Sequence, residues 1–217
     1  MRYKIIMLDL DGTLMDSGEG IMKCAAHALG KMGIAVEDWH SLRRFVGPPL
    51  EDSFKEFYGF SDEEAHMAVM AYRERYFSVG RLEQRPYEGV MEFLAELKGL
   101  GMTLCLATSK MMLQSMFVTE HFGLSQYIDH VFARDDAGML HTKSDVINSG
   151  LNTLHVEDKS GILMIGDRKF DIIGAKECGL DSVGVLYGYG DRDELEKAGA
   201  TYICKDFNEI LDVIKRK

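Results

Sequence analysis

The sequence has few cysteines, no cluster of basic residues large enough to track a phosphate backbone and no long apolar run, and each shortage excludes a class of protein. Its four cysteines are widely spaced and include no Cys-x-x-Cys pair, so we expect reduced, buried thiols in a cytoplasmic protein. The 25 lysines and arginines are outnumbered by 35 aspartates and glutamates, and the net charge of −10 argues against nucleic acid polymers as partners. The apolar stretch near the N-terminus is interrupted at Asp9, too early for a signal peptide or a membrane span.

The chain of 217 residues is long enough for one large domain or for a domain that carries a smaller insertion. From about Gly20 to Gly80 the apolar residues recur at helical spacing, interrupted by the stiff Gly47-Pro48-Pro49 segment. Ser61-Asp62-Glu63-Glu64 has the pattern of a capping box at the start of a further helix. We therefore predict a helical domain of residues 17–81, inserted after the first strand of an α/β core.

The rest of the chain alternates short apolar strands with helices, the pattern of a doubly wound parallel sheet. The expected strands are Ile5–Leu8, Met102–Ala107, Val131–Ala133, Ile162–Ile165, Ser182–Val185 and Thr201–Cys204. Residues 1–16 and 82–217 would form this Rossmann-like core. Because ligands of such sheets bind beyond the carboxyl ends of the strands, we expect functional residues among the polar side chains that follow each strand.

Asp9 and Asp11 follow the first expected strand at a spacing of two. Residues i and i+2 of an extended chain project to the same face, so both carboxylates would enter one small volume. At roughly 4 Å and an effective dielectric near 20, their repulsion is on the order of 4 kcal/mol, which calls for a proton or a cation beside them. Gly12 allows a tight turn at this point, and a plain Asp-Gly surface turn is the structural alternative.

Three further strand ends carry polar residues. Thr108-Ser109 follows the second strand and, with a helix expected from Lys110, would offer hydroxyls and free backbone N–H groups to a phosphate. A basic residue is expected after the third strand, and Lys143 is the candidate because it stands just before the next helix. Asp167 and Asp171 follow the fourth strand, and hard oxygen ligands of this kind suit Mg²⁺. Helix capping and a solvated lysine are the structural alternatives at these positions.

Taken in chain order, these motifs resemble those of the haloacid dehalogenase-like superfamily over essentially the whole sequence. Its first motif, Asp-x-Asp-x-Thr, stands here as Asp9-Leu10-Asp11-Gly12-Thr13. The residues that match its second, third and fourth motifs are Thr108, Lys143, and Gly166-Asp167 with Asp171. The helical insertion resembles the type 1 cap of that family. Two segments are similar to the phosphoglycolate phosphatase-like branch, Phe45-Val46-Gly47-Pro48-Pro49-Leu50 and Leu186-Tyr187-Gly188-Tyr189-Gly190.

The resemblance implies a Mg²⁺-dependent phosphatase that acts on a small phosphorylated metabolite, with no obligate protein partner. Asp9 would attack the substrate phosphorus and form an aspartyl-phosphate, while Asp11 would serve as general acid and then as general base. The metal ligands would be Asp9, the backbone carbonyl of Asp11 and Asp167. Asp171 would support this site from outside the first coordination sphere.

By the same resemblance, Thr108-Ser109 and Lys143 would bind the phosphoryl oxygens. Ser144 follows Lys143 where much of the family has proline, so Lys110 remains an alternative for the phosphate-binding lysine. In the helical domain, Arg43-Arg44 stands beside the stiff glycine-proline segment. We expect these two arginines to contact the part of the substrate that carries no phosphate.

Two other functions are compatible with parts of this pattern. A phosphomutase of the β-phosphoglucomutase type would keep every core motif and return the phosphoryl group to a sugar. A phospho-aspartate signalling switch also places carboxylates, Thr and Lys at strand ends around Mg²⁺, although the inserted helices and the acid at Asp11 argue against it. Release of inorganic phosphate over many turnovers distinguishes a phosphatase from both.

Overall fold

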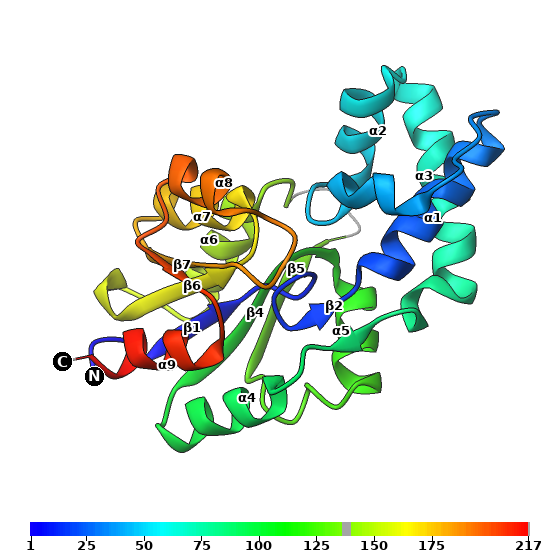
Figure 1. Cartoon of the computed structure of the whole chain (residues 1–217). Helices are drawn as coiled ribbons and strands as arrows, with labels where there is room; N and C mark the ends of the chain where they lie inside the picture. Colours follow the sequence, from blue (N-terminus) through cyan, green and yellow to red (C-terminus); the bar gives the residue numbers. More distant parts are fainter. Residues whose placement is uncertain (136–139, 217) are drawn as a thin grey trace. The chain divides into compact units, whose positions relative to one another are not determined.

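The computed structural model describes residues 1–135 and 140–216, and Figure 1 shows its elements. The chain forms two compact units: Met1–Leu14 with Pro86–Lys217, here called the core unit, and Met15–Arg85, here called the insert. Each helix in the described ranges is too short or too polar to cross a membrane.

The core unit is built on a six-stranded parallel sheet in the order β5-β4-β1-β6-β7-β8. Its strands are β1 (Ile5–Leu8), β4 (Thr103–Met111), β5 (His130–Arg134), β6 (Ile162–Gly166), β7 (Asp181–Val185) and β8 (Tyr202–Cys204). In the centre of the sheet, Met7 of β1 is level with Cys105 of β4 on one side and Met164 of β6 on the other. The predicted doubly wound α/β core with a helical insertion after the first strand is therefore confirmed.

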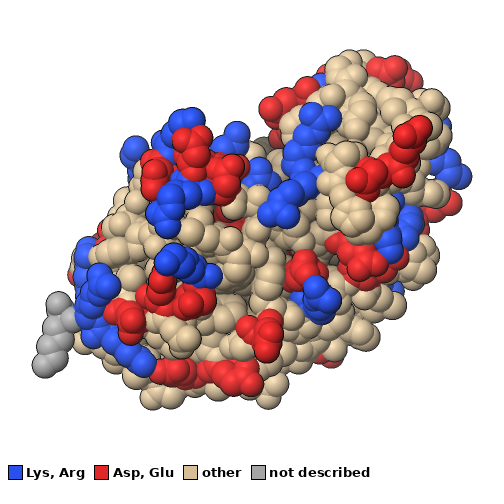
Figure 2. Space-filling view, viewed as in Figure 1, with Lys and Arg blue, Asp and Glu red and all other residues tan. Residues whose placement is uncertain are grey.

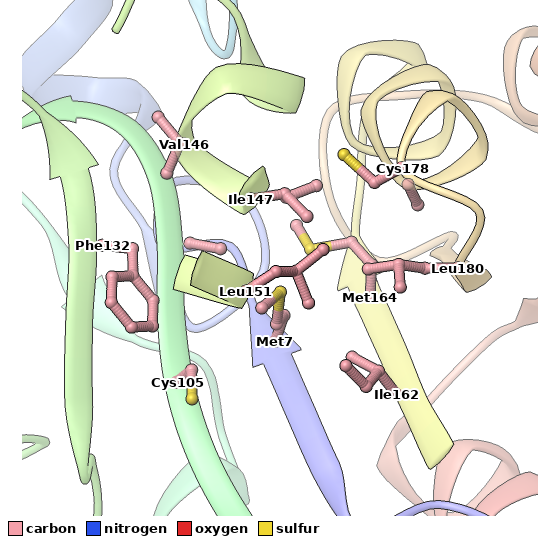
Figure 3. Close-up of a cluster of buried hydrophobic side chains, with 12 residues drawn as sticks. Met7, Cys105, Phe132, Val146, Ile147, Leu151, Ile162, Met164, Cys178 and Leu180 are labelled. Atoms are coloured by element: carbon pink, nitrogen blue, oxygen red, sulfur yellow. The ribbon is translucent and has the colours of Figure 1, made fainter. Parts of the chain in front are cut away.

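Helices cover both faces of the sheet because its central strands are apolar on both faces. The helices of the core unit are α4 (Val90–Gly99), α5 (Met112–His121), α6 (Lys143–Thr153), α7 (Lys169–Glu177), α8 (Arg192–Ala198) and α9 (Phe207–Lys215). Figure 1 shows α6 and α7 on one side of the sheet and α4 and α9 on the other. Met7, Cys105 and Met164 pack with Ile147 of α6 and with Cys178, the residue that follows α7, in one buried cluster (Figure 3).

Strand β4 is longer than the sequence predicts, and helix α5 starts later. The expected helix start at Lys110 is wrong, because β4 continues to Met111 and α5 begins at Met112. The register against β5 shifts between Thr108 and Met111, and the Lys110 amide donates to the Thr108 hydroxyl oxygen at 3.3 Å. Such a bulge inserts unpaired residues and re-aims their side chains. Thr108 and Ser109 therefore lie in a strand and not at the N-terminus of a helix.

The insert follows β1 and is mainly helical, as predicted. Its elements are α1 (Gly18–Lys31), the 3₁₀ helix η1 (Trp39–Phe45), α2 (Leu50–Tyr58), α3 (Asp62–Ser78) and the 3₁₀ helix η2 (Gly80–Leu82). The capping box expected at the start of α3 is present, with the Ser61 hydroxyl accepting from the Glu64 amide and the Glu64 carboxylate accepting from the Ser61 amide. Strands β2 (Met15–Asp16) and β3 (Arg85–Pro86) pair in a two-stranded sheet that the sequence analysis did not predict.

Candidate active site

Three neighbouring strands bring the predicted residues to one edge of the sheet. Because β4, β1 and β6 are parallel and adjacent, Thr108 near the end of β4, Asp9 just after β1 and Asp167 just after β6 lie at the same carboxyl edge. The Asp9 amide donates to the carbonyl of Ile165 in β6 at 2.9 Å, which fixes the backbone as it leaves the strand. The first turn of α6 adds Lys143 to this edge.

Lys143 binds two of the aspartates. Its ammonium group donates to Asp9 Oδ1 at 2.6 Å and to the carbonyl oxygen of Ala107 at 3.0 Å, and its Nζ lies 2.7 Å from Asp171 Oδ1. Lys143, Asp9 and Asp171 are all buried. A Cβ at Gly174 of α7 would collide with the Lys143 side chain, so this glycine makes room for the lysine. The capping box of Thr142 and Asp145 fixes the start of α6, and with it the root of Lys143.

Three carboxylates cluster here, two of them bound to Lys143. One oxygen each of Asp9, Asp167 and Asp171 lies within 4.8 Å of the others. Burial raises the pKa of Asp9 to about 6 although Lys143 acts in the opposite direction. Burial, with the charges of Asp171 and Asp9, raises the pKa of Asp167 well above its ordinary value. Burial alone would lower the pKa of Lys143, but Asp171 and Asp9 outweigh it and raise that pKa, so the lysine is protonated.

Asp167 is held by groups that carry no charge. It accepts from the Thr13 hydroxyl at 3.4 Å and from the Tyr189 amide at 2.7 Å, and within residues 1–135 and 140–216 it forms no ion pair. A Cβ at Gly12, where φ is +86°, or at Gly188 would overlap the Asp167 side chain. The loop after β7 is thus part of the site. The sequence analysis singled out this loop only because it is similar to the phosphoglycolate phosphatase-like branch. The glycines on either side of Tyr189 were the one local sign that another part of the chain packs closely against the loop.

Asp11 stands apart from the three clustered carboxylates. Its carboxylate accepts two hydrogen bonds from the ammonium group of Lys110 in β4, at 2.7 and 2.9 Å. The two aspartates of the first motif therefore contact different lysines, Asp9 with Lys143 and Asp11 with Lys110.

The remaining predicted residues lie at two places. Thr108 is buried and Ser109 half-buried, both in the last part of β4. Arg43 and Arg44 are exposed on η1 of the insert. The Arg44 guanidinium lies over the ring of Phe57, 4.2 Å from its centroid, and 5.5 Å from that of Tyr58. The structure thus brings Asp9, Thr108, Lys143, Asp167 and Asp171 to one edge of the core unit.

The clustered carboxylates fit a divalent cation. Asp9, Asp167 and Asp171 supply hard oxygen donors, which suit Mg²⁺, and with Lys143 as the paired cation two negative charges are left uncompensated when all three are ionised. Asp167 is fully buried, and a buried carboxylate without a cation partner is costly. Figure 2 shows acidic and basic side chains interspersed on the face it presents. The surface of that face therefore gives an anionic ligand little attraction, and inside the site such a ligand would depend on Lys143 and on a bound cation to offset the carboxylates.

Comparisons with known proteins agree with this arrangement. The sequence profile described as haloacid dehalogenase-like hydrolase matches residues 6–185. The crystal structure of a predicted phosphatase from Clostridium acetobutylicum is 42% identical and superposes with a TM-score of 0.95 over 99% of both chains. A protein named 5'-nucleotidase from Pseudomonas aeruginosa is 36% identical over 99% of this chain and 97% of its own. A protein named tyrosine-protein kinase PtkA from Mycobacterium tuberculosis is 32% identical over 92% of this chain and 68% of its own.

The profile covers most of the sequence and includes the ends of β1, β4 and β6, where the clustered residues lie. The similarity of the fold extends over the insert as well as the core unit, because the crystal structure from Clostridium acetobutylicum aligns along nearly the whole chain. The chain therefore belongs to the haloacid dehalogenase-like hydrolase family, among enzymes of the phosphatase type.

Proposed function

We propose that this protein hydrolyses a small phosphate monoester through a covalent phosphoaspartate at Asp9. The observation that carries the proposal is the buried Asp9 carboxylate, which lies 2.6 Å from the Lys143 ammonium and within 4.8 Å of oxygens of Asp167 and Asp171. A carboxylate that attacks a phosphate anion needs a cationic neighbour, which offsets the repulsion between the two, and a fixed position from which to attack. Lys143 and the strand end supply both.

Each residue then has a distinct task in two steps. In the first, an Asp9 carboxylate oxygen bonds to phosphorus, the ester P–O bond breaks, and Asp11 gives its proton to the leaving oxygen. In the second, a water oxygen bonds to phosphorus, Asp11 takes the proton that the water loses, and the bond from phosphorus to Asp9 breaks. Inorganic phosphate leaves and the Asp9 carboxylate is restored. Thr108-Ser109 and Lys143 hold the phosphoryl oxygens during both steps.

Mg²⁺ is the proposed metal. Asp9, Asp167 and the backbone carbonyl of Asp11 would hold it, and Asp171 supports the site through its contact with Lys143. When bound, the ion neutralises negative charge on the phosphoryl group and on the carboxylates. The Tyr189 amide and the Thr13 hydroxyl keep Asp167 oriented toward the other carboxylates.

The proposed substrates are nucleoside monophosphates, phosphoglycolate-like acids and sugar phosphates. Nucleoside 5'-monophosphates come first in a screen because the Pseudomonas aeruginosa relative named 5'-nucleotidase aligns over nearly the full length of both chains. The helical domain predicted at residues 17–81, which lies within the insert, would act as the cap that selects the substrate. Arg43 and Arg44 on η1 are the candidate specificity residues.

The test measures inorganic phosphate released from p-nitrophenyl phosphate and from these three substrate classes, with Mg²⁺ and with EDTA. Wild-type protein should give many turnovers that require Mg²⁺, and Asp9→Asn should give none. Lys98→Met, which breaks a surface pair with Asp129, is the matched control and should retain the wild-type rate. A single labelling event per chain would support a signalling switch instead, and sugar phosphate isomerisation with little free phosphate would support a mutase.

A further inference from the structure

Asp11 and Lys110 form a close pair at the edge of the site. The Lys110 ammonium lies 2.7 Å from one carboxylate oxygen of Asp11 and 2.9 Å from the other. The exposed fractions are 9% for the Lys110 side chain and 13% for Asp11, so solvent screens the pair little. The two residues are 99 positions apart in sequence and come from two different strand ends.

The backbone directs Lys110 to this carboxylate. The shift of register between Thr108 and Met111 lets β4 continue past Thr108, and the Lys110 amide is tied back to the Thr108 hydroxyl. The Lys110 side chain therefore extends from a strand and not from the first turn of a helix. Lys143, by contrast, is already bound to Asp9, to Asp171 and to the Ala107 carbonyl.

We propose that Lys110 is a positioning residue that holds Asp11 for the second step of the reaction, in which Asp11 takes a proton from water. This inference rests on the proposed function. Within the described part of the chain, the Asp11 carboxylate accepts two hydrogen bonds, and both come from Lys110. Without them the carboxylate is free to take other rotamers, and a misplaced base transfers protons slowly. Binding of the phosphoryl oxygens is left to Thr108, Ser109 and Lys143.

The two steps can be separated with p-nitrophenyl phosphate. Nitrophenolate is a stable leaving group that needs no proton, so formation of the phosphoaspartate does not depend on Asp11. Its hydrolysis still does, because the attacking water must lose a proton. General acid–base catalysis contributes about 10²- to 10⁴-fold to such a step. Partial loss of positioning should therefore slow the second step by roughly 10-fold or more and leave the first unchanged.

The experiment compares wild type with Lys110→Met and Lys110→Arg in Mg²⁺, by rapid mixing and acid quench. In Lys110→Met we expect a burst of nitrophenolate near one per chain at the wild-type rate, slow steady-state turnover and accumulated phosphoenzyme. Lys110→Arg, which keeps a cationic donor, should restore part of the steady-state rate. Lys98→Met, which removes the lysine of another ion pair, is the matched control and should leave both steps unchanged. If Lys110→Met does not fold, Lys110→Gln takes its place.

Equal slowing of the burst and of steady-state turnover, with no accumulated phosphoenzyme, would overturn the proposal and assign Lys110 to the phosphoryl group. Unchanged kinetics in Lys110→Met would overturn it as well. If the proposed phosphatase function is itself wrong, the result is different, because the wild type would then form no phosphoenzyme and release no phosphate from any ester.

Discussion

The Lys143 ammonium lies 2.6 Å from Oδ1 of Asp9, and both side chains are buried. This contact joins the first turn of α6 to the end of β1, across 134 positions of sequence. It supplies the positive charge that a buried carboxylate nucleophile needs if a phosphate anion is to approach. The sequence left open whether Lys143 or Lys110 takes this place, and we propose Lys143 because of its contact with Asp9.

Replacing Lys143 by methionine should lower both activity and stability. We expect kcat/KM with Mg²⁺ to fall by about 10²- to 10³-fold, the usual loss for one donor to a developing charge. In EDTA, where no metal is bound, the buried carboxylates of Asp9 and Asp171 are left without the Lys143 ammonium in this variant. The free energy of unfolding should therefore drop by about 3 to 5 kcal/mol. Urea unfolding and steady-state kinetics measure the two effects.

The matched control for this change is Lys98→Met, whose pair with Asp129 is one-third exposed and should be worth about 1 kcal/mol or less. If Lys143→Met kept the wild-type kcat/KM and Lys110→Met lost most of it, the phosphate-binding role would belong to Lys110 and not to Lys143.

Replacing Thr108 by valine should reduce catalysis without unfolding the protein. Valine keeps the shape of the buried side chain and removes the hydroxyl, which accepts from the Lys110 amide at 3.3 Å and which we assign to a phosphoryl oxygen. A loss of about 10²- to 10³-fold in kcat/KM is expected. Thr119→Val is the control, because Thr119 is also buried but its hydroxyl donates within α5 to the Ser115 carbonyl at 2.9 Å. Equal kinetic losses in the two variants would mean that Thr108 acts only through packing.

The strands and the order of the motifs could be predicted because buried apolar runs and their turn residues are local features. Ile5–Leu8 is confirmed to the residue, and the helix expected after Ser61 begins at Asp62. The end of β4 could not be predicted, because it depends on the pairing of Met111 with Arg134 in a different strand. Local sequence does not specify such a pairing.

The partners of the site residues were harder to predict than the residues themselves. That an acid follows β1 is visible in the sequence, but which lysine reaches it depends on the paths of β4 and α6. The Tyr189 amide that binds Asp167 could not be predicted either, since every residue except proline has a backbone N–H. A role that a backbone group performs can therefore be assigned only when the fold is known.

Asp129 should give the protein an acid-sensitive component of stability. Burial opposes ionisation of this carboxyl, but its bonds from the Lys98 ammonium and the Leu104 amide outweigh burial and lower its pKa. A lowered folded-state pKa stabilises the protein fully above the unfolded pKa, about 4, and this contribution is lost as pH falls through the folded value. Asp129→Asn should therefore remove about 1 kcal/mol at pH 7 and progressively less below pH 4.

Urea unfolding of Asp129→Asn from pH 2.5 to 7 checks this window. The control is Asp193→Asn, which breaks an exposed i,i+4 pair with Lys197 and should change stability little at any pH. A difference between Asp129→Asn and wild type that grows as pH falls would contradict the sign of the argument.

Gly188→Ala should weaken metal binding more than it weakens the fold. A Cβ at this position would overlap both the Asp167 side chain and the Gly12 carbonyl, so the loop or Asp167 must shift. The Tyr189 amide that orients Asp167 belongs to the same loop and would move with it. Disturbing a group that orients a metal ligand typically costs about 10- to 100-fold in affinity. Mg²⁺ should therefore raise the melting temperature of wild type at concentrations that leave Gly188→Ala unchanged.

The control is Gly99→Ala at the end of α4, where a Cβ meets open space, and it should respond to Mg²⁺ like wild type. Equal Mg²⁺ responses in Gly188→Ala and wild type would mean that the loop can yield without moving Asp167, and Asp167→Asn would then have to show whether that carboxylate binds the ion at all.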